Sequence, residues 1–524
     1  MIAHGGLDDC PADEFKNKKS QCLKRVLERP GRMFMRNHLI GLTAVIAAAI
    51  FFLSCGGSSS TSETGTTPTT SGQLAVMGTD APVCSVSAFK VTITGLTLTP
   101  QSGETPVSVI NSSNPVTVDF ASLMGFNTLL DLSSVPEGTY AYATFTFLPN
   151  PQLTVFEGNP PLPTTINATL TQTTVKASIN PALQVSADSS SGLTLDFRLF
   201  QSIQTDPTTG QITGTVDPTI RVFPAVITSA DGLGVIDALD GIVQTVTTTS
   251  TNTNFTGSFT LQVRNTRTFQ VNVTSETRFD GVSELSAMTK GLYVEVNAII
   301  DQEGNIVARN VEAESVADAT TAAFVGPVLS VTTDSSGNAI QLTMFVRNEN
   351  PDVSATVPLL STVAVIISSE TGFKIASLGG DTSPLPFDAS VIARGQEVVV
   401  HGPFAAGTPP TITAKMIALR PQPALGNVLS TPSPVIGSDG KTGGFYMAPC
   451  NPLFQNQVVN VITSRDTIFS GLTDLNSLDT TSVYLNRGLL FYTTTSGSLN
   501  GLSWTAPPPA YVLPAHMVRK LNLP

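Results

Sequence analysis

Tyr140–Leu148 reads YAYATFTFL, and this alternation decides the fold of the first half of the chain. One set of positions holds Ala141, Ala143, Phe145 and Phe147, and the other holds Tyr140, Tyr142, Thr144 and Thr146. Successive side chains of a β-strand point to opposite faces, so the pattern predicts a strand with one buried and one solvent-facing side. The turn sequence Val135-Pro136-Glu137-Gly138-Thr139 leads into it.

Short runs of the same kind lie on both sides of this strand. They are 89–94, 116–120, 193–197 and 220–227. No stretch between residues 73 and 228 keeps helical spacing for more than a turn or two. We therefore expect an antiparallel β-sandwich of about seven strands over residues 73–228.

The composition favours strands throughout the chain. Hydrophobic residues make up 41% and charged residues 13% of the sequence, which is typical of a globular protein. Thr and Val are abundant and suit a pleated surface because they branch at Cβ, while 36 Pro and 41 Gly interrupt the strands. The predicted fold class is all-β.

The second half of the chain repeats itself three times. A Gly-x-Val pattern begins each unit, at Gly241, Gly326 and Gly426. A Thr-x-Phe pattern follows, ending at Phe279, Phe373 and Phe469. A glycine before an apolar strand comes third, at Gly291, Gly395 and Gly488. An Ala-x-x-Val/Ile pattern closes each unit, at Ala308, Ala414 and Ala515. The first two units also share Val-Arg-Asn, at 263–265 and 346–348.

Each unit has room for about five or six short strands joined by Gly-rich turns, which favours a small OB-like barrel. We expect the three phenylalanines of the Thr-x-Phe pattern to occupy equivalent buried positions. The sequence thus predicts an N-terminal β-sandwich followed by three tandem small OB-like β-barrels. The predicted barrel boundaries are 234–316, 319–422 and 423–524.

A hydrophobic segment near the N-terminus indicates export. Leu39–Leu53 is apolar, follows Arg36 and ends at Ser54-Cys55-Gly56-Gly57, the three parts of a secretory signal. It is shorter than the roughly 20 residues of a transmembrane helix, and a buried core helix is the alternative reading. We assign residues 1–54 to a leader and signal peptide, with Met1, Met33 or Met35 as the start, and residues 55–72 to a Ser/Thr/Gly-rich tether.

The segment Phe52-Leu53-Ser54-Cys55 resembles the bacterial lipobox, although Leu53 stands at the second position before the cysteine and Phe52 at the third, where Leu is usual. The resemblance implies cleavage before Cys55 and lipidation of its thiol, so that the lipid on Cys55 would hold the protein at a membrane. Gly56, rather than Asp, resembles the rule for outer-membrane sorting in enteric bacteria. The expected location is the cell envelope, at the outer membrane or the cell surface.

Two further resemblances concern the folded domains. Leu74-Ala75-Val76, Thr79-Asp80-Ala81-Pro82 and Leu195-Asp196-Phe197 resemble the N-terminal domain of a bacterial lipoprotein family of unknown function, in which an acidic residue often stands where this chain has Arg198. The turn before Tyr140 resembles those of transthyretin-like sandwiches, which are often adhesion or sugar-binding modules. The repeated units, residues 234–524, resemble a bacterial envelope family of unknown function that occurs as tandem OB-like copies.

Charge and cysteine content exclude several functions. Residues 55–524 hold 19 basic and 34 acidic residues, a net charge of about −15, which disfavours nucleic acid as a partner. Cys84 and Cys450 are the cysteines left after Cys55. A bridge between them is possible but is the less favoured alternative, because they fall in the first and last domains, and the sequence leaves their pairing open. With His401 and His516 they are too few for a zinc site, and no cofactor is expected.

The sequence contains none of the motifs HExxH, GxSxG or CxxC, so it carries no local sign of catalysis. Asp80, Asp119 and Asp196 could cluster as an acid/base set, but they lie at strand ends, where aspartate more often caps a turn. Tyr140 and Tyr142 are the best candidates for a binding surface, because we place them opposite the phenylalanines. We expect a non-enzymatic binding or structural role with a glycan or an envelope protein. The alternative is an envelope hydrolase whose site is assembled across domains.

Overall fold

The computed structural model describes residues 70–521, except 81–82, 125, 226–234, 264–266, 317–320, 377–384, 455–456 and 506–509. The predicted signal peptide, Cys55 and nearly all of the tether lie outside the described residues. In the described part, strands dominate and the helical segments are about one turn long, so the predicted all-β class is confirmed. None of those helical segments has the length and hydropathy needed to cross a bilayer.

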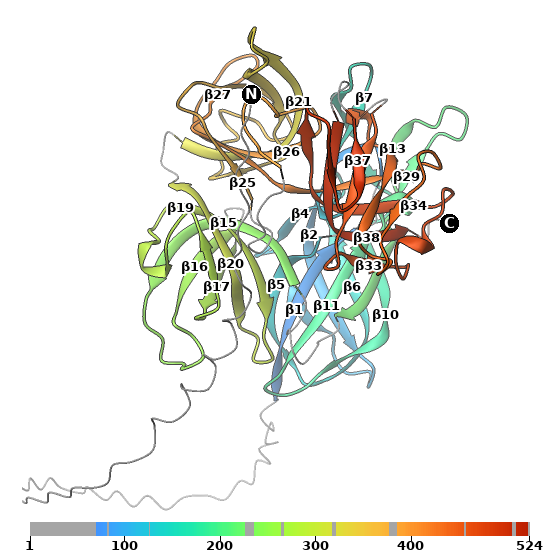
Figure 1. Cartoon of the computed structure of the whole chain (residues 1–524). Helices are drawn as coiled ribbons and strands as arrows, with labels where there is room; N and C mark the ends of the chain where they lie inside the picture. Colours follow the sequence, from blue (N-terminus) through green and yellow to red (C-terminus); the bar gives the residue numbers. More distant parts are fainter. Residues whose placement is uncertain are drawn as a thin grey trace, which may run out of the picture. The chain divides into compact units, whose positions relative to one another are not determined.

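The described strands before residue 226 form the N-terminal β-sandwich (Figure 1). They are β1 (Ser71–Thr79), β2 (Val86–Pro100), β3 (Val107–Ile110), β4 (Val116–Asp119), β5 (Thr128–Pro136), β6 (Gly138–Phe147), β7 (Gln152–Glu157), β8 (Leu162–Asn167), β9 (Thr169–Leu170), β10 (Thr174–Val185), β11 (Ser190–Phe197), β12 (Ile203–Thr205), β13 (Ile212–Val216) and β14 (Ile220–Ala225). The main sheet has the order β5-β1-β11-β14-β10-β6-β2-β7-β8, with β3 and β4 also on β2. Most pairs are antiparallel as expected, but β1–β11, β10–β14 and β9–β13 are parallel.

Aromatic packing joins the two halves of this sheet around one core. Phe197 of β11 lies 5.3 Å from Phe89 of β2 and 5.9 Å from Phe147 of β6, measured between ring centroids. Phe120 follows β4 and lies 5.1 Å from the same ring. All four rings are buried, so the apolar set of the alternating strands faces inward as predicted.

The decisive strand contains a β-bulge that the alternation does not reveal. On β2 the partners of β6 pass from Tyr142 directly to Tyr140, so Ala141 is the extra residue. The bulge turns Tyr140 inward, where it is 2% exposed and its hydroxyl donates to the Pro136 carbonyl at 2.8 Å. The predicted outward position is therefore wrong for Tyr140. Tyr142 is 41% exposed, as expected.

Three barrels follow, and they share one strand topology. The first comprises β15 (Val235–Thr247), β16 (Gly257–Val263), β17 (Arg267–Val273), β18 (Arg278–Asp280), β19 (Leu292–Ile300) and β20 (Ile306–Val316). The second comprises β21 (Thr321–Thr333), β22 (Ala339–Phe345), β23 (Asn348–Asn350), β24 (Thr362–Ile366), β25 (Gly372–Ile375), β26 (Glu397–Ala405), β27 (Thr411–Thr413) and β28 (Met416–Leu419). The third comprises β29 (Pro421–Val428), β30 (Val435–Ile436), β31 (Gly443–Pro449), β32 (Val459–Thr463), β33 (Ile468–Ser470), β34 (Val483–Leu489), β35 (Phe491–Thr493), β36 (Gly497–Leu499), β37 (Leu502–Trp504) and β38 (Ala510–Leu521).

The rings close in the same way in all three units. Their orders are β17-β16-β15-β19-β20, β24-β22-β21-β26-β27 and β32-β31-β29-β34-β38, and each ring closes by a parallel pair between its two end strands. Each unit also has a short strand in a parallel pair: β18 with β20, β25 with β28 and β33 with β38. In the second barrel, β27 and β28 together take the place of the single last strand of the others. The predicted tandem OB-like architecture is confirmed.

Contacts between the second and fourth sequence patterns explain why both recur. The hydroxyls of Thr277, Thr371 and Thr467 donate to the carbonyls of Ala308, Ala414 and Ala515 at 2.7, 2.8 and 2.7 Å. Two residues later, Phe279, Phe373 and Phe469 pair with Val311, Ile417 and Val518. The three phenylalanines are thus equivalent. Their rings are half-buried and pack against the barrel cores, so the prediction of equivalent positions holds and that of burial holds only in part.

The third pattern is not equivalent in the last unit. Gly291 and Gly395 precede their strands at φ +89°, a conformation that favours glycine. Gly488 lies inside β34, where a Cβ would overlap the Pro514 carbonyl oxygen, just as a Cβ at Gly402 would overlap that of Thr413. Gly488 therefore corresponds to Gly402 and reflects a close approach of two strands.

The four domains pack together through shared apolar cores. Ala75 and Leu129 of the sandwich join the core of the first barrel. Tyr293 of the first barrel packs with Ala323 and Val399 of the second. Ile462 of the third barrel belongs to the core of the second. The barrels therefore pack against the sandwich and against one another instead of standing apart as separate domains. As a result, residues far apart in sequence can build a common site.

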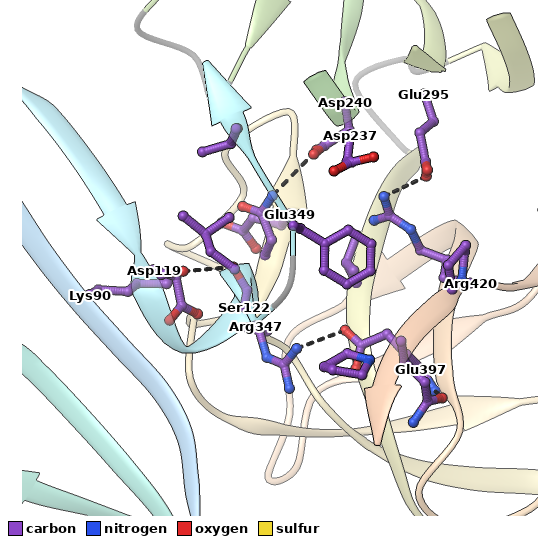
Figure 2. A pocket seen from close by; sticks show the side chains of 18 of the residues that line it. Lys90, Asp119, Ser122, Asp237, Asp240, Glu295, Arg347, Glu349, Glu397 and Arg420 are labelled. Atoms are coloured by element: carbon purple, nitrogen blue, oxygen red, sulfur yellow. Dashed lines mark hydrogen bonds and ion pairs between the residues drawn. The ribbon is translucent and has the colours of Figure 1, made fainter. Parts of the chain in front are cut away.

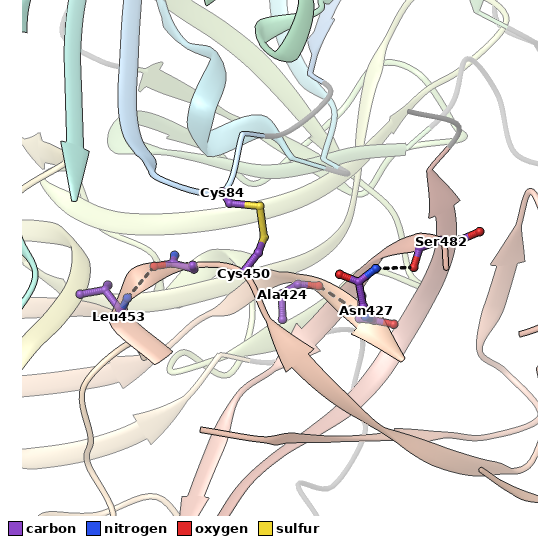
Figure 3. The surroundings of a disulfide bond; sticks show 8 residues. Cys84, Ala424, Asn427, Cys450, Leu453 and Ser482 are labelled. Atoms are coloured by element: carbon purple, nitrogen blue, oxygen red, sulfur yellow. Dashed lines mark hydrogen bonds between the residues drawn. A yellow bond between two sulfur atoms is a disulfide. The ribbon is translucent and has the colours of Figure 1, made fainter. Parts of the chain in front are cut away.

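A disulfide adds a covalent link between the first and last domains. Cys84 precedes β2 and Cys450 follows β31, and they are 366 residues apart in the chain (Figure 3). The less favoured alternative, a bridge, is therefore the one that forms. The first and last domains lie together, because Ala88, Phe156 and Leu453 share one apolar cluster.

Candidate functional site

A cavity of about 320 Å³ lies where the sandwich and all three barrels meet, and we call it the four-domain cavity (Figure 2). Four of the side chains that line it are cationic: Lys90, Arg347, Arg420 and Arg487. Seven are carboxylic acids: Asp119, Asp237, Asp240, Glu295, Glu349, Asp352 and Glu397. The concentration of charge is notable in a chain with only 13% charged residues.

Each arginine of the cavity forms an ion pair with a carboxylate. Arg347 Nη1 lies 3.1 Å from Glu397 Oε1, within the second barrel. Arg420, between β28 and β29, pairs with Glu295 of the first barrel. Arg487 Nη2 of β34 lies 2.8 Å from Asp237 Oδ1 of β15. Two of the three pairs thus fix one barrel against another.

The Arg487 pair also includes the sandwich. Its guanidinium carbon lies 3.9 Å from the centroid of the Phe126 ring, a cation–π contact. Asp237 accepts a hydrogen bond from the backbone N–H of Asn127 at 3.2 Å, and its own N–H donates to the Asn127 carbonyl at 3.0 Å. The loop before β5 is therefore held by two barrels at once.

Asp119 comes from the sandwich wall of the cavity. It ends β4, and its cross-strand partner on β2 is Lys90, so both side chains stand on the same face. Asp119 Oδ1 accepts a hydrogen bond from the Phe89 N–H at 2.8 Å. Oδ2 is buried and has no hydrogen-bond partner among the described residues. A buried carboxylate oxygen without a donor is unfavourable, so a ligand with a donor group would stabilise it.

Glu349 and Asp352 form an acidic pair in the wall. Glu349 is 5% exposed, and its Oε1 accepts a hydrogen bond from the Val353 N–H at 3.1 Å. The pKa of Glu349 is raised to about 7, chiefly by burial and also by the neighbouring Asp352, while the Val353 hydrogen bond and Lys90 oppose the rise. Hydrogen bonds from Ser354 lower the pKa of Asp352. One acid of the pair therefore keeps its proton near neutral pH while the other is ionised.

Burial acts on two other acids of the cavity in the same direction. It raises the pKa of Glu295 to about 7; Arg420 opposes this change, and Glu312 and Asp240 reinforce it. It also raises the pKa of Glu397, against the effects of Arg347 and Arg420. Burial thus favours the protonated, uncharged form of several acids of the cavity.

A second cavity, of about 550 Å³, lies between the sandwich and the first barrel. Amide side chains dominate its wall: Asn111, Asn114, Gln270, Asn272 and Asn305. Arg267 pairs there with Asp131, and its Nη2 donates to the Asn114 carbonyl at 3.0 Å.

The residues predicted as a binding surface lie elsewhere. Tyr142 is exposed with Lys176 Nζ 4.3 Å from its ring centroid, and Tyr140 is buried in the sandwich. Neither lines the four-domain cavity. Cys55 lies outside the described residues.

The three strand-end aspartates are not brought into one site. Asp80 Oδ1 accepts a hydrogen bond from the Leu199 N–H at 3.2 Å, and Asp119 lines the four-domain cavity. Burial raises the pKa of Asp196, and Arg198 and Arg221 oppose it. Among the described residues, no group of three or more His, Cys, Asp or Glu side chains is arranged to hold a metal ion.

One signal in the sequence did point to this site. The shared Val-Arg-Asn pattern places Arg347 and Asn348 in the wall of the cavity, where Asn348 Nδ2 donates to Asp240 Oδ2 at 3.4 Å. The corresponding Arg264 and Asn265 of the first barrel lie outside the described residues. Nothing local marks the remaining wall residues, because they come from separate domains.

In comparison with known proteins, a family model matches the sandwich domain and does not extend into the barrels. Residues 71–213 match a family described as "Domain of unknown function (DUF4382)", which supports the resemblance predicted for this domain. A solved structure, "drosophila Unr CSD456", is similar at 8% sequence identity with a TM-score of 0.12, covering 55% of this chain and 98% of that chain. No curated protein matches the sequence.

Proposed function

We propose that this protein is a lipid-anchored component of the cell envelope that binds a glycan without cleaving it, and that the glycan enters the four-domain cavity. The anchor is Cys55, supported by Leu39–Leu53 and the lipobox-like residues before it. The acidic balance of residues 55–524 and the Ser/Thr/Gly-rich tether agree with a domain assembly outside the cytoplasm.

The observation that carries this proposal is the mixed lining of the cavity. Arg347 and Arg420 offer planar donors, and Asp119 Oδ2 is a buried acceptor without a partner among the described residues. Each sugar hydroxyl both donates and accepts a hydrogen bond, so a saccharide can satisfy such a wall. A volume of about 320 Å³ is at the small end of ligand pockets and suits one or two sugar units.

A second candidate is the hydrolase assembled across domains. The observation in its favour is Glu349, whose pKa is raised to about 7 beside the ionised Asp352. A carboxylic acid that is still protonated near neutral pH is suited to general acid catalysis.

A glycan-binding experiment separates these candidates. The full chain is applied to an array of bacterial envelope glycans, and any bound glycan is incubated with the protein while the release of reducing ends is followed. We expect binding without release, and binding at least 10-fold weaker for Asp119→Asn. Asp188→Asn is the matched control, because Asp188 is exposed, does not line the cavity, and has φ 51°, which Asn also tolerates.

Other results would change the assignment. Release of reducing ends that Glu349→Gln abolishes would support the hydrolase. Absence of glycan binding together with retention of an envelope protein that Asp119→Asn releases would favour a protein partner instead.

A further inference from the structure

The four-domain cavity contains an unbalanced set of acids. Its seven carboxylic acids face four cations, so full ionisation would leave a formal charge of −3. Three of the acids, Glu397, Glu295 and Asp237, form ion pairs with the arginines. Asp119, Asp240, Glu349 and Asp352 remain, and Lys90 is the further cation of the wall (Figure 2).

Three of these four acids are buried, and Asp352 is exposed at the rim. Asp119, Asp240 and Glu349 are 6%, 7% and 5% exposed. Neutral donors satisfy part of Asp240, because the Tyr293 hydroxyl and the Asn348 amide donate to its Oδ2 at 3.3 and 3.4 Å. Asp119 Oδ2 has no such donor in the described part of the chain. Burial of ionised carboxylates with so little compensation is unfavourable, so these acids either keep a proton, as Glu349 does near neutral pH, or bind a cation.

We propose that Asp119, Glu349 and Asp352 bind the ammonium group of a small amine, so that the glycan of the proposed function is an amino sugar. The inference rests on that function and specifies the chemistry of its ligand. An ammonium group supplies three N–H donors and one positive charge, which matches an unpartnered carboxylate oxygen beside an acidic pair. Lys90 and the three arginines cannot match all seven acids when these are ionised. An ammonium group beside Glu349 would favour loss of the Glu349 proton and pair with the carboxylate, whereas a neutral sugar would not.

Three disaccharides of nearly equal size test the inference. They are chitobiose with two amino groups, di-N-acetylchitobiose with both amines blocked, and cellobiose with hydroxyls in their place. Binding to the full chain is measured by isothermal titration calorimetry at pH 6.5. We expect chitobiose to bind at least 10-fold more tightly than either of the others. 1,4-Diaminobutane is the fourth probe and reports the ammonium group without the sugar.

Two variants locate the binding. Asp119→Asn keeps an oxygen for the Phe89 N–H but removes the charge, and it should reduce chitobiose affinity at least 10-fold while changing cellobiose affinity less than 3-fold. Glu349→Gln provides a second test if Asp119→Asn lowers the melting temperature. Asp188→Asn should leave all four affinities unchanged.

The outcomes separate this inference from the function on which it rests. Equal binding of cellobiose and chitobiose, both weakened by Asp119→Asn, would overturn the ammonium site and keep the glycan function. Binding of 1,4-diaminobutane alone would keep the ammonium site and overturn the glycan. Binding of none of the four probes would overturn the inference, and the glycan array then decides the proposed function. Calcium chloride that binds at Asp119 and excludes chitobiose would show that the acids select a metal ion instead.

Discussion

Arg487 and Asp237 are 250 residues apart in the sequence, yet Arg487 Nη2 lies 2.8 Å from Asp237 Oδ1. They belong to the third and first barrels, and the guanidinium also stacks on Phe126 of the sandwich at 3.9 Å. One ion pair thus connects three domains at the wall of the four-domain cavity.

Removal of Arg487 alone should lower the free energy of unfolding more than removal of both charges of the Arg487–Asp237 pair. Arg487→Met leaves Asp237 buried without its cation, and we expect the free energy of unfolding to fall by about 3–5 kcal/mol. The double variant Arg487→Met with Asp237→Asn should recover at least half of that loss. Urea unfolding of the four proteins of this cycle measures the coupling. Equal losses in the single and double variants would show that the ion pair contributes nothing beyond packing.

The disulfide should stabilise the assembly of the first and last domains. Cys84→Ser with Cys450→Ser removes a cross-link over 366 residues, and we expect a loss of about 2–5 kcal/mol. Thermal melting with and without dithiothreitol checks this, because the reductant should lower the melting temperature of the wild type and leave the double variant unchanged. A reductant effect of equal size on both proteins would contradict the pairing.

The repeated threonines should each stabilise their own barrel. Thr371→Val and Thr467→Val remove the buried hydroxyl that donates to Ala414 or Ala515, and each should cost about 1–2 kcal/mol. Thr277→Val tests the same contact in the first barrel. Thr245→Val is a control, because Thr245 is exposed and bonds to Thr260 at 2.7 Å on the surface. Losses in the three barrels that do not exceed the control would show that the contact is not structural.

Truncation of the half-buried phenylalanines to alanine should lower the free energy of unfolding less than truncation of a fully buried aromatic residue. Phe279→Ala, Phe373→Ala and Phe469→Ala remove rings that pack at the barrel margins, so we expect losses of about 1.5–3 kcal/mol each rather than the 3–5 typical of full burial. Chemical denaturation measures them, with Phe445→Ala as the fully buried comparison. A loss for Phe469→Ala as large as that for Phe445→Ala would contradict this ranking.

Glu349 should make stability depend on pH. Burial raises its pKa in the folded protein to about 7, above the value of 4.5 for an ordinary glutamate, so the folded state holds its proton more tightly. Its stabilising contribution is complete below about pH 4.5 and is lost as the pH rises through 7. We expect the wild type to lose about 1–2 kcal/mol more than Glu349→Gln between pH 5 and pH 8. Parallel pH profiles from urea unfolding would show that Glu349 titrates normally.

Local patterns in the sequence determined the elements and the repeats of this protein. Alternation over a strand and the spacing of Thr277 and Ala308 reflect contacts with neighbouring strands of one sheet, and these are readable because the side-chain period of a strand is fixed. The same reasoning failed at Tyr140, where one extra residue in β6 moved the side chain to the other face.

The tertiary structure alone decided how the domains meet. The pairing of Cys84 with Cys450 and the contacts of Arg487 with Asp237 and of Arg420 with Glu295 depend on the docking of separately patterned domains. Docking buries surfaces whose residues follow no common period along the chain, so no window of sequence contains both sides of the contact. The sequence of each domain fixes which acids it contains. Their concentration in one cavity arises because packing brings together acids from the sandwich and the first two barrels.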